Sequence, residues 1–110
     1  MGDRYATTLV FAQLEVVLGQ LALRPKADSW SDETAGLYLG AEAFAAHLGR
    51  YLADVKNETA RRFALGARTI AATMDQARRD RLAPATAVAM IPTGTLRRMR
   101  ELRDRLYRPQ

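Results

Sequence analysis

Residues 60–83 read ARRFALGARTIAATMDQARRDRLA, and this stretch decides the fold. Its apolar side chains recur every three or four residues, at Ala60, Phe63, Ala67, Ile70, Met74 and Ala77. That period places all six on one face of an α-helix, which predicts an amphipathic helix over residues 58–83 with its apolar face buried. Pro84 follows directly and marks the end of this helix.

The rest of the chain shows the same helical period and no alternation typical of β-strands. We therefore predict an all-α fold in one domain spanning residues 1–110: a small bundle of about four helices, with alanine-rich packing and no sheet. The predicted helices lie near residues 4–23, 30–55, 58–83 and 96–107, with a linker over 84–95. The last is expected to have Thr95 as its N-cap. The sequence leaves open whether the second helix ends at 55–58 or continues through a bend.

The first predicted helix is apolar on nearly every side. Only Gln13, Glu15 and Gln20 interrupt the apolar run of residues 9–23. Such a helix is either central in its bundle or meets a partner with its second face. We therefore predict contact with a second copy of the chain, or with other protein subunits, through this helix.

The second predicted helix carries three glycines, Gly36, Gly40 and Gly49. Each weakens a helix by about 1 kcal/mol relative to alanine. Their presence indicates that a neighbouring backbone approaches closely, so we predict a packing seam along this helix.

Charge is divided unevenly along the chain. Residues 1–60 carry five basic and eight acidic side chains, a net charge of −3, whereas residues 61–110 carry twelve arginines against four acidic side chains, a net charge of +8. Clustered positive charge repels itself unless a partner neutralises it. The second half is therefore expected to meet a polyanion, with nucleic acid, an anionic membrane surface and an acidic protein as the candidates.

Three arginines of the third predicted helix form a row. Arg61, Arg68 and Arg79 fall within roughly 20° of one another at 100° per residue, on the side away from the apolar face. They are separated by roughly 10 and 16 Å along the helix axis. Because guanidinium binds phosphate through a planar fork of donors, this row suits a phosphate backbone.

The residues that we predict to contact nucleic acid are Arg61, Arg62, Arg68, Arg78, Arg79, Arg81, Arg97, Arg98 and Arg100. No helix-turn-helix and no RNP-type aromatic pair accompanies them, so contact is expected with the backbone of RNA or DNA irrespective of base sequence. Two other interpretations stay open. The basic half could dock on an acidic protein, which would make the chain a protein–protein adaptor, or it could be a solvated face.

Residues typical of enzymes are scarce. His47 is the single histidine and there is no cysteine, which leaves no ligand set for zinc or di-iron. No serine has a nearby base, and no glycine-rich phosphate loop is present. The run His47-Leu48-Gly49-Arg50 departs from the His-x-Leu-Lys-Gly run of histidine phosphotransfer modules, which favours an ordinary surface histidine. We predict a chain that is not an enzyme and that needs no cofactor or metal.

The sequence predicts a cytoplasmic protein without contact to a membrane. Its first residues lack the basic-then-apolar pattern of a signal peptide, and no uncharged apolar run reaches 18 residues. The absence of cysteine agrees with a reducing compartment.

In size, helicity and arginine pattern, the chain resembles the small subunit of multi-subunit CRISPR–Cas effector complexes. The resemblance spans the whole chain and rests on no diagnostic motif. It implies a thin helical bundle that stacks along a filament and lines the groove beside the guide–target duplex or the displaced strand. It also implies a role in antiviral defence within a ribonucleoprotein complex. An apolar first helix and an arginine face would suit such a subunit, and a phage or plasmid accessory protein would look similar.

Overall fold

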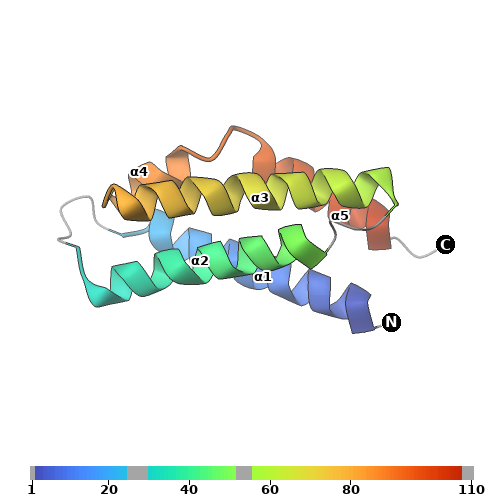
Figure 1. The fold of residues 1–110 in the computed structure, drawn as a ribbon, viewed down its shortest axis with the longest axis horizontal. Coiled ribbons are helices and arrows are strands. Elements are labelled where there is room, and N and C mark those ends of the chain that lie inside the picture. Colours follow the sequence, from blue (N-terminus) through green and yellow to red (C-terminus); the bar gives the residue numbers. More distant parts are fainter. Residues whose placement is uncertain (1, 25–29, 52–55, 108–110) are drawn as a thin grey trace.

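The computed structural model describes residues 2–24, 30–51 and 56–107, and every regular element in these ranges is a helix. In chain order the helices are α1 (Gly2–Ala22), α2 (Asp32–Tyr51), α3 (Glu58–Arg79), α4 (Pro84–Ala89) and α5 (Thr95–Tyr107). They form an elongated bundle that measures 48 × 21 × 20 Å. α1 packs on α2, α2 on α3 and α3 on α5. The start of α1 and the end of α5 lie at the same end of the bundle (Figure 1). The predicted all-α bundle is confirmed.

The helix α3 is the central element of this bundle. The apolar stripe predicted from its sequence is buried along its whole length, including the fully buried Phe63, Ile70 and Met74. Phe63 meets Phe11 of α1 edge to face, with ring centroids 5.3 Å apart. Because α2, α4 and α5 also contact α3, the predicted stripe is the core of the molecule.

Side chains before α2 and α3 explain where these helices begin. The Ser31 Oγ accepts a hydrogen bond from the Thr34 N–H (3.1 Å), and the Asn57 Oδ1 accepts one from the Thr59 N–H (2.8 Å). Both side chains satisfy N–H groups that a first helical turn leaves without a partner. Because Asn57 caps a new helix, α2 and α3 are separate, and the predicted end of the second helix at 55 lies outside the described residues.

The helix α3 ends in a turn that usually contains glycine. The Leu82 N–H donates to the Ala77 carbonyl (3.0 Å). The Arg81 N–H donates to the Arg78 carbonyl (3.1 Å), which completes the paired hydrogen bonds of a Schellman motif. Arg81 occupies the left-handed position with a φ of 52°, which costs a non-glycine residue roughly 1–2 kcal/mol. The Tyr38 hydroxyl donates to the Leu82 carbonyl (2.7 Å) and ties this turn to α2.

Two predictions about the C-terminal elements are wrong. The stretch 84–95, predicted as a linker, contains the short helix α4, in which Pro84 and Ala87 are buried. Pro84 suits the first turn of a helix because its missing N–H would have no partner there. Thr95 is the first residue of α5 rather than its N-cap, and its hydroxyl donates to the Pro92 carbonyl (2.7 Å).

The predicted glycine seam on α2 is present at one position only. A Cβ added at Gly49 would lie 2.7 Å from the Arg68 Cγ of α3, so glycine makes room there for the Arg68 side chain between α2 and α3. At Gly36 and Gly40 an added Cβ would meet nothing within 4 Å. The prediction is therefore confirmed for Gly49 and wrong for the other two.

The helix α1 has a buried and an exposed apolar side. The buried side includes Phe11, Leu14, Leu18 and Leu21. On the opposite side Leu9 and Val16 are 45% and 59% exposed, and Leu23, directly after the helix, is 85% exposed. Because these three are spaced by seven residues, they form one stripe along the helix. The bundle therefore does not enclose α1.

Candidate nucleic-acid interface

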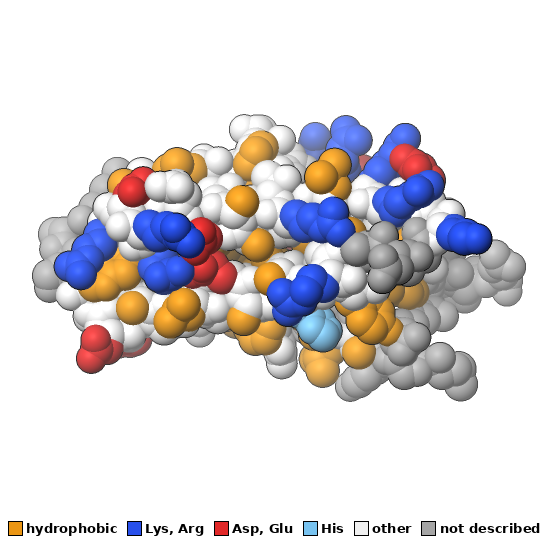
Figure 2. Space-filling model, in the orientation of Figure 1, with side chains coloured by type: hydrophobic (Ala, Val, Ile, Leu, Met, Phe, Trp, Pro, Cys, Tyr) orange, Lys and Arg blue, Asp and Glu red, His pale blue; other side chains and the backbone are white. Residues whose placement is uncertain are grey.

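The nine arginines predicted to contact nucleic acid do not share one environment. Five lie on α3, one lies in the turn after it, and three lie on α5. On the face shown in Figure 2, Lys and Arg side chains gather along the line of α3, with acidic side chains beside some of them. The partners of each arginine within the chain decide whether a ligand can reach its charge.

The predicted row on α3 is exposed but interrupted. Arg61, Arg68 and Arg79 are all exposed. Asp75 lies on the same side of α3 and forms an ion pair with the Arg79 Nε (3.0 Å). Glu58 forms another with Arg61 (3.3 Å). Exposed pairs within one helix are weak, so a phosphate can replace either carboxylate at little cost.

Arg78 differs from the row because two carboxylates hold it. Its Nε donates to Glu42 of α2 (2.7 Å) and its Nη2 donates to Asp75 (2.9 Å). The hydrogen bond with Glu42 raises the pKa of Arg78. Burial raises the pKa of Asp75, but hydrogen bonds and the charges of Arg79 and Arg78 outweigh burial and lower it overall. Arg78 therefore joins α3 to α2 instead of presenting its charge to a ligand.

Arg100 is engaged in the same way between α5 and α1. Its Nε donates to Glu15 (2.5 Å), and the Arg103 Nη1 lies 3.8 Å from the same carboxylate. The Arg103 guanidinium also lies 5.4 Å from the ring centre of Phe11. These contacts fasten α5 to α1.

Arg68 is held by a hydrogen bond from its guanidinium to the backbone and not by an acidic side chain among the described residues. Its Nη2 donates to the Gly49 carbonyl (3.3 Å) at the end of α2, where helical carbonyls lack intrahelical partners. Among the described residues no carboxylate forms an ion pair with Arg68. Its guanidinium is therefore held in place without a carboxylate partner among the described residues.

Arg81, Arg97 and Arg98 are exposed and likewise form no ion pair within the described ranges. We call these three together with Arg68 the uncompensated arginines. All four belong to the nine predicted arginines; Arg50 of α2 and Arg105 of α5 are likewise exposed and form no ion pair within the described ranges.

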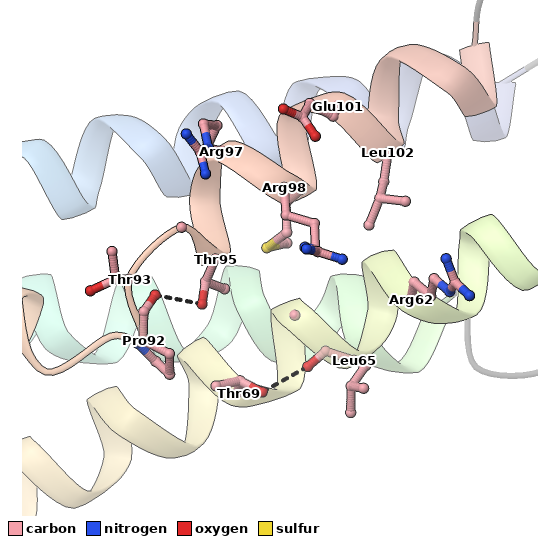
Figure 3. Close-up of a pocket in the computed structure, with 13 residues that line it drawn as sticks. Arg62, Leu65, Thr69, Pro92, Thr93, Thr95, Arg97, Arg98, Glu101 and Leu102 are labelled. Atoms are coloured by element: carbon pink, nitrogen blue, oxygen red, sulfur yellow. Dashed lines mark hydrogen bonds between the residues drawn. The ribbon is translucent and has the colours of Figure 1, made fainter.

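Three of the predicted arginines, Arg62, Arg97 and Arg98, line a groove between α3 and α5, which has a volume of about 450 Å³ (Figure 3). Its walls include Arg62, Leu65, Gly66 and Thr69 from α3 and Arg97, Arg98, Glu101 and Leu102 from α5. The loop 92–94 closes one end. Figure 3 shows Arg98 pointing from α5 toward α3, where Arg62 stands on the facing wall.

The structure gives His47 an ordinary surface position. It is exposed on α2 and stacks on Tyr51 with ring centroids 5.9 Å apart. Within the described ranges no group of three or more His, Cys, Asp or Glu side chains could hold a metal ion.

The sequence did not lead us to predict the ion pairs that Glu15, Glu42 and Asp75 form with arginines. A signal existed for two of them. Glu15 is the only charge within residues 9–23, and a charge in an apolar run usually has a partner. Asp75 falls on the arginine row, 14 residues after Arg61.

No helix in the part of the chain that the structure describes is long and apolar enough to cross a membrane. Comparison with protein-family models, curated proteins and solved structures found no match.

Proposed function

We propose that this chain is a non-catalytic, cytoplasmic subunit that binds the backbone of RNA or DNA through its C-terminal half. The observation that carries this proposal is the set of uncompensated arginines, Arg68, Arg81, Arg97 and Arg98. These four side chains are exposed and, unlike Arg78 and Arg100, form no ion pair with a described carboxylate. Guanidinium groups on helices suit phosphate, and no base-reading motif accompanies them, so binding is independent of base sequence.

The backbone of Arg81 gives independent support. This residue holds a left-handed conformation that glycine would adopt without strain. Strained residues of this kind cluster at functional positions. An exposed arginine in such a position is consistent with a role for its charge.

Assembly through α1 is the second part of the proposal. The exposed stripe of Leu9, Val16 and Leu23 suits a second copy or another subunit of a nucleoprotein complex. The small subunits of CRISPR–Cas effector complexes, which the chain resembles, provide the specific form: copies stack through one face and a strand runs along another.

A protein–protein adaptor is the alternative, and one observation favours it. Leu65 is 63% exposed beside the basic side chain of Arg62. Apolar and basic side chains side by side also suit an acidic amphipathic segment of a partner.

Binding to generic oligonucleotides separates the two functions. We expect the purified protein to bind two labelled single strands of unrelated sequence with equal affinity at low salt. The double variant Arg68→Ala/Arg81→Ala should weaken both about 100-fold, at about tenfold for each charge-assisted contact. Lys56→Ala is the matched control because it removes an exposed charge outside the proposed surface. Binding to an acidic peptide with no binding to either oligonucleotide would establish the adaptor instead.

A further inference from the structure

The groove between α3 and α5 is shaped by contacts among its own lining residues. A Cβ added at Gly66 would lie 2.9 Å from the Met99 Cγ, so glycine allows the buried Met99 to form the floor. At the closed end the Thr95 hydroxyl donates to the Pro92 carbonyl (2.7 Å; Figure 3). A groove built in this way needs little reorganisation before a ligand enters.

Positive charge faces this groove from both walls. Arg98 has no ion pair with a described residue, and Arg62 uses its Nε for Glu58 (3.2 Å). The Nη groups of Arg62 form no ion pair with a described carboxylate, so they can bind an anion. Glu101 is the one acidic side chain among the described lining residues, against three arginines. The net charge of the lining therefore favours an anionic ligand.

The size and the apolar part of the groove narrow the class of anion. A volume of about 450 Å³ falls within the range typical of sites for small organic ligands. Leu65 is an exposed apolar residue at the outer edge of the groove, where its side chain extends from α3 away from α5 (Figure 3). A ligand that combines a phosphate with a flat apolar group would use both features.

We propose that this groove binds one nucleotide unit of a single-stranded nucleic acid, with its phosphate between Arg62 and Arg98 and its base against Leu65. The inference rests on the proposed function. It adds that the nucleic acid is single-stranded and that it lies in this groove. A base within a duplex is paired and stacked and cannot reach the wall of a groove, whereas an unpaired base can.

A leucine variant tests this inference without changing any charge. The probes are labelled ten-residue oligothymidine and a ten-base-pair duplex, measured by fluorescence anisotropy. Leu65→Ala should weaken binding of the single strand about fivefold through lost apolar contact and leave duplex binding unchanged. Leu39→Ala is the matched control, because Leu39 is an exposed leucine on α2 outside the groove. Arg98→Ala should weaken single-strand binding about tenfold, as expected for a charge-assisted contact.

The possible outcomes distinguish failure of the groove inference from failure of the proposed function. If Arg81→Ala weakens binding while Leu65→Ala and Arg98→Ala do not, the groove inference is overturned and the proposed function stands. If the folded wild-type protein binds neither probe at low salt, both are overturned. Loss of acidic-peptide binding in Leu65→Ala and Arg98→Ala, with oligothymidine binding unchanged, would assign the groove to a protein partner and overturn the inference.

Discussion

At the scale of single residues, Arg78 and Arg81 lie three positions apart near the end of α3 and differ in their surroundings. Arg78 is partly buried and donates to Glu42 and Asp75. Arg81 is exposed, has no described carboxylate partner, and holds a left-handed backbone. The first is suited to joining helices and the second to meeting a ligand.

Glu42→Ala is expected to lower the melting temperature of the protein. Arg78 would lose a partner across the α2–α3 contact while its charge stays partly buried, and an unpaired buried charge is unfavourable. Glu58→Ala is the control, since Glu58 is mostly exposed and its ion pairs with described residues all lie within α3. Thermal unfolding followed by circular dichroism measures both. Equal melting temperatures for wild type and Glu42→Ala would contradict the structural role of Arg78.

Arg81→Gly is expected to raise the free energy of unfolding by about 1 kcal/mol, because glycine adopts a positive φ without strain. The same change should weaken oligonucleotide binding, since it removes an uncompensated charge. Arg81→Ala should weaken binding equally without the gain in stability. Urea denaturation and anisotropy measure the two effects. A stabilised glycine variant with unchanged binding would show that Arg81 contacts no phosphate.

At the scale of elements, periodicity predicted the start and the apolar face of α3 but placed its end at residue 83 instead of Arg79, and it did not predict α4. The stripe from Ala60 to Ala77 repeats over five turns, so its burial could be read from spacing. The six residues of α4 are too few to show a period. Which glycines face a neighbour depends on how helices cross, which spacing within one helix does not encode. The sequence therefore identified Gly49 together with two glycines that face open space.

The glycines allow a matched pair of substitutions. Gly36→Ala should stabilise the protein by about 1 kcal/mol, because its Cβ meets nothing within 4 Å and alanine favours helix. Gly66→Ala should destabilise it by about 1 kcal/mol, because the new Cβ forces the buried Met99 to move. Urea denaturation measures both. Equal stabilisation by the two changes would contradict the close contact between α3 and α5.

At the scale of the whole molecule, charge is divided along the sequence but partly neutralised in space. Glu15 and Glu42 of the acidic half pair with Arg100 and Arg78 of the basic half. The sequence could therefore predict that the C-terminal half is basic, but not which arginines keep their charge. That depends on contacts between residues 36 and 85 positions apart, which only the fold brings together.

Self-association through α1 is the expected behaviour of the isolated protein at high concentration. Water contact with Leu9, Val16 and Leu23 is unfavourable, and a second copy can cover them. Val16→Lys should shift the protein toward monomer in sedimentation velocity, whereas Ala72→Lys, which adds the same charge on an exposed part of α3, should not. A wild-type protein that sediments only as monomer at high concentration would contradict assembly through α1.

The salt dependence of single-strand binding tests the central claim most directly. If the uncompensated arginines contact phosphates, the logarithm of the binding constant falls linearly with the logarithm of salt concentration. Arg81→Ala and Arg98→Ala should each then reduce the slope by about 0.7, the value for one contact to a single strand. Lys56→Ala should leave the slope unchanged. Absence of oligonucleotide binding at low salt by the folded protein, or a slope that neither arginine variant alters, would contradict the account.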